Sequence, residues 1–127
     1  MIPRRMLLAG FVLAPFSVAA HEPQRGPNGG QKADIGSNHA ELVAAGNTLR
    51  LFLFDGADRP VPAAGVTAQV VVLAAGRQTT VVLAPTGDNE LGGTGDFTAA
   101  RGMRAVVTLI LPGQRPAQAR FTPMDQN

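Results

Sequence analysis

Short apolar runs, each ending in residues that favour turns, fill this chain from residue 31 onward and constrain its fold most. In residues 39–45, for example, Ala40, Leu42 and Ala44 share one face of an extended chain, and positions 39, 41 and 43 share the other. A period of two places successive side chains on opposite faces of a β-strand, whereas an amphipathic helix needs a period of 3.6. The pattern therefore predicts an all-β fold.

Eight segments share this pattern of a few apolar or β-branched residues bounded by Gly, Pro, Asn or Asp. They are residues 31–35, 39–45, 48–54, 66–75, 78–84, 96–100, 104–111 and 117–122. Gly46-Asn47 and Gly76-Arg77 are expected to close two hairpins, because Gly and Asn accept a positive φ at low cost. We expect an antiparallel β-sandwich, or a flattened barrel, of about seven to eight strands.

The predicted core consists of aliphatic or aromatic side chains that share one face of these strands. Its members are Leu42, Leu51, Leu53, Val70, Val72, Val81, Leu83, Val107, Leu109 and Phe121. Residues 55–65 and 85–95 are expected to be loops, and Leu91 is expected to turn inward from the second of them.

The first twenty residues have the features of a signal peptide. Arg4 and Arg5 form a basic start, residues 6–16 are apolar, and residues 17–20 are small, which predicts cleavage after Ala20. An ordinary secretory signal and a twin-arginine signal both remain open. Export to the bacterial periplasm or secretion is expected, with residues 21–30 as a flexible arm rich in Pro and Gly, residues 31–123 as a single domain and residues 124–127 as a tail.

The charge of the expected mature chain is close to zero. The eleven basic residues include Arg4 and Arg5, so nine remain against nine acidic residues. This balance argues against nucleic acid and anionic lipid as partners. No later run reaches the ~20 apolar residues needed to span a bilayer, so no stable membrane insertion is expected after cleavage. The absence of cysteine excludes disulfides, thiolate sites and a lipid anchor on cysteine.

Enzyme activity is not expected. The only serines are Ser17, which leaves with the signal peptide, and Ser37, which stands beside His39 on the same segment rather than on a converging one. A pair of catalytic carboxylates is not expected either, because the aspartates at positions 55, 58, 88 and 96 fall in turn-like stretches, where Asp commonly caps turns.

Three residues are candidate metal ligands: His21, His39 and Glu41. His39 and Glu41 are two residues apart on one predicted strand face, about 7 Å between Cα atoms. Imidazole nitrogen and carboxylate oxygen both bind divalent metals, Cu(II) heads the affinity order, and affinity should fall below about pH 6.5. A solvated surface histidine with a polar neighbour is the alternative, and the residues alone leave both interpretations open.

The Gly-Pro-Asn-Gly-Gly run at residues 26–30 also has two interpretations. It could form a backbone nest that binds an anion. The favoured interpretation is a tight turn that directs the arm into the first strand, because neither a Lys-Ser pair nor a helix follows it.

Several short stretches resemble a known group of proteins. They are residues 26–31 (Gly-Pro-Asn-Gly-Gly-Gln), 39–43 (His-Ala-Glu-Leu-Val), 49–53 (Leu-Arg-Leu-Phe-Leu), Asp55 and 59–61 (Arg-Pro-Val). The chain resembles small exported bacterial β-rich proteins that are similar to the β-rich segment near the start of periplasmic adaptor subunits in heavy-metal efflux pumps. In that group a His-rich arm precedes the turn, but this chain has Arg25 where a His is common.

The resemblance implies a role in copper or other heavy-metal resistance, with His21, His39 and Glu41 as the matching positions. Two hypotheses follow. The chain is either a periplasmic metal-binding accessory to resistance or efflux, or a non-catalytic module without metal. The module would dock an envelope partner, such as an efflux adaptor, through a sheet edge or residues 55–65.

Overall fold

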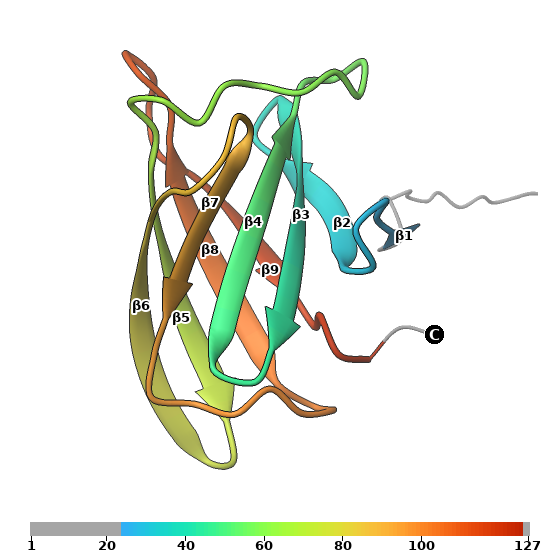
Figure 1. The fold of residues 1–127 in the computed structure, drawn as a ribbon, viewed down its shortest axis with the longest axis vertical. Coiled ribbons are helices and arrows are strands. Elements are labelled where there is room, and N and C mark those ends of the chain that lie inside the picture. Colours follow the sequence, from blue (N-terminus) through green and yellow to red (C-terminus); the bar gives the residue numbers. More distant parts are fainter. Residues whose placement is uncertain (1–23, 126–127) are drawn as a thin grey trace, which may run out of the picture.

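The computed structural model describes residues 24–125, which form nine strands and no helix (Figure 1). The strands are β1 (Gln24–Arg25), β2 (Gln31–Ile35), β3 (Asn38–Ala45), β4 (Thr48–Phe54), β5 (Thr67–Ala74), β6 (Arg77–Pro85), β7 (Glu90–Thr94), β8 (Arg104–Ile110) and β9 (Ala117–Phe121). The all-β fold predicted from the alternating pattern is confirmed.

All neighbouring strands are antiparallel, in the order β1-β2-β3-β4-β7-β6-β5-β8-β9. This single sheet curls into a half-barrel, so that β3, β4 and β7 lie across from β8 and β9 (Figure 1). The curl brings β2 next to β9, where the Gln31 side chain accepts a hydrogen bond from the Thr122 backbone N–H at 2.6 Å. The arrangement as a sandwich of two sheets is not confirmed.

The concave face of the sheet holds the core. Leu42, Leu51 and Leu91 stand side by side across β3, β4 and β7, and none of them is exposed. Val70 and Val107 form part of a matching row in β5 and β8. All ten predicted core residues and Leu91 are buried, because the two-residue period places each of them on the concave face.

Three local expectations were wrong. Leu91 lies in β7, a strand that fills part of the expected loop 85–95. Residues 96–100 form no strand, since the Ala99 N–H donates to the Gly46 carbonyl at the β3–β4 turn instead of to a neighbouring ladder. The β5–β6 hairpin closes at Ala75-Gly76, one residue earlier than expected, with φ of 51° and 73°.

The expected signal peptide, residues 1–20, and the candidate ligand His21 lie outside the described residues. Residues 24–30 of the expected arm are described, and they comprise β1 and a hydrogen-bonded turn. The part of the chain that the structure describes has no helix long and apolar enough to span a membrane.

Candidate functional site

Glu41 lies in the middle of β3, on the convex face of the sheet, and is completely buried. Its carboxylate accepts hydrogen bonds from the Asn28 backbone N–H at 2.8 and 3.1 Å, from the Asn28 side-chain amide at 2.9 Å and from the Gly30 N–H at 2.7 Å. The turn at residues 26–30 is thus a tight turn, and it is also a nest of N–H donors around an anion. The anion is the chain's own carboxylate.

The glycines of this turn are explained by close approach. A Cβ on Gly26 would overlap the Glu41 carboxyl group, and a Cβ on Gly30 would overlap the Leu42 carbonyl oxygen. The turn is closed by the Gly26 N–H, which donates to the Gly30 carbonyl at 2.8 Å, and Gly29 has a φ of 84°. Only residues without a side chain allow the backbone to wrap this closely around Glu41.

His39 lies near the start of β3, between two carboxylates from other segments. Its Nε2 is 3.2 Å from Oδ1 of Asp34 on β2, and its Nδ1 is 2.8 Å from Oδ1 of Asp58. Lys32 also donates to Asp58 at 2.6 Å, and its ammonium lies 5.1 Å from the centre of the Phe54 ring. We call Lys32, Asp34, His39 and Asp58 the His39 cluster.

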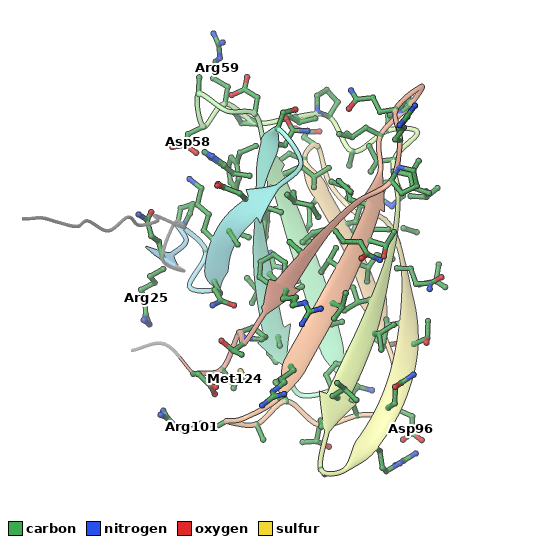
Figure 2. All side chains as sticks on the ribbon, turned by 180° about the vertical axis from the view of Figure 1, so that it is seen from behind. Arg25, Asp58, Arg59, Asp96, Arg101 and Met124 are labelled. Atoms are coloured by element: carbon green, nitrogen blue, oxygen red, sulfur yellow. The ribbon has the colours of Figure 1, made fainter. Side chains whose placement is uncertain are left out.

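The loop after β4 carries Asp58 to this position. The Asp55 carboxylate accepts hydrogen bonds from the Ala57 and Arg59 N–H groups at 2.8 and 2.9 Å, which tightens the loop. Asp58 has a φ of 63°, a conformation that Asp tolerates better than most residues. Figure 2 shows Asp58 and Arg59 on this loop, at one end of the half-barrel.

Hydrogen bonds from Lys32, and then from His39, lower the pKa of Asp58 below its usual value. A carboxyl with a lowered pKa in the folded state stabilises the fold above its unfolded pKa of about 3.9. The stabilisation is lost as pH falls through the lower, folded-state pKa.

We therefore expect Asp58→Asn to destabilise the protein at about pH 6, and the destabilisation to decrease as pH falls below the unfolded pKa of about 3.9. Urea unfolding of both proteins across this range measures the difference. The exposed Asp88→Asn serves as a control, and an Asp58→Asn effect that stays constant with pH would contradict the assignment.

Two of the three candidate ligands, His39 and Glu41, lie near each other, but their side chains do not converge on one point. His39 and Glu41 do share the convex face of β3, as predicted, but Glu41 points into the turn at residues 26–30. The residues that contact His39 are Asp34 and Asp58, which the sequence analysis did not single out. Asp34 had a usable signal, because a two-residue Gly36-Ser37 turn places it opposite His39 in a hairpin.

The chemistry of the His39 cluster follows from its hydrogen-bond inventory. When Nδ1–H donates to Asp58, a neutral ring presents the lone pair of Nε2 to the Asp34 carboxylate. Two acceptors 3.2 Å apart repel each other unless a cation, either a proton or a metal ion, lies between them. Within residues 24–125, no group of three or more His, Asp or Glu side chains is arranged to hold a metal ion by itself.

Comparison of the chain with protein-family profiles, with curated proteins and with solved structures finds no match.

Proposed function

We propose that the protein is a small exported, non-catalytic domain that binds a divalent heavy-metal ion, with copper as the first candidate, in support of metal resistance or efflux. His39 supplies the central ligand through Nε2. The proposal is supported by the carboxylates on both sides of this ring, and by the resemblance of the turn and the His-x-Glu segment to those of efflux-adaptor segments.

The geometry around His39 suits a metal ligand. Metal-bound histidines commonly donate their other ring N–H to a carboxylate, and Asp58, 2.8 Å from Nδ1, is placed to accept such a bond. Adjacent ligands, each about 2 Å from a metal, stand roughly 3 Å apart. The 3.2 Å between Nε2 and the Asp34 oxygen is close to that spacing, so Asp34 is the proposed oxygen ligand.

His21 is proposed as a further ligand, because the chain enters the sheet beside the cluster. Gln24 of β1 pairs with Lys32 of β2 in an antiparallel register. Positions before Gln24 therefore correspond to positions after Lys32, in the direction of Asp34. His21 is three positions before Gln24 in the sequence, and a fully extended chain covers about 10 Å over three positions. In this proposal Glu41 is a positioning residue and not a ligand. It holds the turn at residues 26–30, which fixes β1 and therefore the direction of the chain toward His21.

Titration of the exported chain with Cu(II) and Zn(II), followed by calorimetry, tests the proposal. We expect binding tighter than micromolar at one site, weakened more than about tenfold in His39→Ala, because one ligand of a small set is lost. Asp34→Asn, which removes the proposed oxygen ligand, should also weaken metal binding. Its control is Asp88→Asn, which removes an exposed carboxylate on the β6–β7 loop. Millimolar binding, or equal affinity in His39→Ala, would reject the metal site.

Mass spectrometry of the exported form examines the role of His21 separately. If the first residue is His21, its α-amine and ring nitrogen are available to chelate together. If the chain starts elsewhere, the amino-terminal part of the proposed ligand set is rejected.

The second candidate function is a docking module for an envelope partner without metal. One observation favours it: a depression of about 450 Å³ lies between Pro60, Val61 and Pro62 of the expected docking loop and residues 85–89. Binding of a partner that persists in His39→Ala and in the presence of a chelator, but is lost when Val61 is replaced by Asp, would support this function.

A further inference from the structure

The four strands β5, β6, β8 and β9 carry three arginines and no acidic residue. Arg77 is paired with Asp96 at 2.7 Å. By contrast, Arg104 on β8 and Arg120 on β9 have no carboxylate partner among the described residues, although both guanidinium groups are charged at any physiological pH. Among the described residues, Arg104 and Arg120 therefore leave the β8–β9 part of the sheet cationic.

Arg104 and Arg120 stand close together on the convex face. Val106 pairs directly with Arg120, and Arg104 lies two residues before Val106 on the same strand. Residues in this diagonal relation have Cα atoms about 7–8 Å apart, so two long side chains reach one common point. Figure 2 shows β8 and β9 on the side of the molecule that faces the viewer.

A depression of about 350 Å³ lies at this point. Arg104 and Arg120 supply its charge, and Leu73 and Val106 supply an apolar floor. Leu73 is directly opposite Arg104 in the β5–β8 pairing and is 41% exposed, so its side chain is accessible to a ligand. Gln31 and Thr122, which are hydrogen-bonded to each other, form the rim of the depression on the side of β2.

From this combination we infer that the depression binds a small amphipathic carboxylate, an anion that carries a short aliphatic chain. The planar guanidinium fork matches a carboxylate in bidentate geometry, and the absence of a competing acid leaves both forks available. The aliphatic part of the ligand covers Leu73 and Val106. This contact favours binding because it removes apolar surface from water. The volume lies at the lower end of the range for small-molecule sites, which favours a short ligand over a protein surface.

This site is independent of the His39 cluster, which lies on β2, β3 and the loop after β4. Octanoate, below its micelle-forming concentration, is the ligand to test with the exported chain. We expect one site by calorimetry, with amide chemical-shift changes in NMR spectra confined to β5, β8, β9 and the rim. Octanol, which lacks the charge, should bind much more weakly, and so should inorganic phosphate, which lacks the chain.

Arg104→Ala and Arg120→Ala should each weaken octanoate binding about tenfold, since each removes a charge-assisted hydrogen-bonding group. Leu73→Glu should abolish binding, because it places a carboxylate of the chain itself beside Arg104. Arg77→Ala is the matched control, because Arg77 lies on β6 of the same half of the sheet but does not line the depression. His39→Ala should also leave octanoate binding unchanged. Thermal unfolding monitored by circular dichroism verifies that each exposed-site variant is folded.

Three results would overturn the inference. The first is an octanoate affinity that does not change in Arg104→Ala and Arg120→Ala. The second is phosphate binding as tight as octanoate binding, since the apolar floor would then play no part. The third is cosedimentation with phosphatidylglycerol vesicles without binding of free octanoate, which would make this face a membrane-contacting surface instead.

Discussion

Replacing Glu41 with alanine is expected to lower the free energy of unfolding by about 3 kcal/mol, although Glu41 is charged and stands on the convex face of a sheet. The carboxylate is fully buried and accepts hydrogen bonds from two backbone N–H groups and one side-chain amide of residues 26–30. Its removal leaves the Gly30 N–H buried without an acceptor and releases the turn. Chemical denaturation with urea measures the loss directly.

Glu90→Ala is the matched control for Glu41→Ala. Glu90 also lies on the convex face, directly beside Phe52 on the neighbouring strand, but its partner Arg50 is about half exposed. A partly exposed ion pair of this kind contributes less than about 1 kcal/mol. Equal losses in the two variants would mean that the turn does not depend on the Glu41 carboxylate.

Glu41→Gln separates charge from shape. The amide keeps the volume and one acceptor oxygen, but it turns an NH₂ group toward the donors of the turn. An intermediate loss is therefore expected. Glu41→Gln also shows how Glu41 affects metal binding. If metal affinity and stability fall together in this variant, Glu41 acts by holding the turn in place and is not itself a ligand.

The part of the fold that the sequence predicted is the part set by short-range alternation. The β3–β4 hairpin closes at Gly46-Asn47 as expected, and the buried face of each long strand was assigned correctly. Strand β7 was missed because Gly92 and Gly93 break the pattern: a Cβ on Gly93 would crowd the Val82 carbonyl oxygen, so glycine is required by packing there. Curling of the sheet depends on contacts between β2 and β9 that are distant in sequence, and no local pattern encodes them.

The candidate site was predicted less well, for a related reason. His39 and Glu41 were placed on one face by their spacing, yet their partners come from other segments of the chain. The carboxylate of Glu41 is taken by residues 11 to 13 positions earlier, and Asp58 reaches His39 from the loop beyond β4. A two-residue separation predicts a shared face, but it does not predict which neighbour a side chain binds.

The net charge of the chain likewise did not predict where the charged residues lie on the fold. Nine basic and nine acidic residues after Ala20 sum to a charge near zero, which argued against nucleic acid and anionic lipid as partners. The structure nevertheless gathers Arg104 and Arg120 on strands that have no acidic residue. Two long stretches without any Asp or Glu, residues 65–87 and 97–124, were visible in the sequence and would have indicated this separation.

Leu51→Ala is expected to cost about 2–5 kcal/mol, the range for a buried leucine whose removal leaves a cavity. Leu51 lies in the middle of the concave face between Leu42 and Leu91, and all three are completely buried. The backbone of two neighbouring strands holds these positions, so the surrounding side chains cannot collapse fully into the space. Val82→Ala is the control, because Val82 is 72% exposed and should change stability by only about 0.5 kcal/mol.

Leu109→Ala extends this test to the other half of the half-barrel. Leu109 lies on β8, pairs with Ala68 of β5 and belongs to the same buried cluster as Leu51. If the curled sheet encloses one core, Leu51→Ala and Leu109→Ala both fall in the large range, and urea unfolding of each variant remains a single transition. A large loss in one variant with an effect like that of Val82→Ala in the other would mean that the two halves of the sheet do not pack against each other.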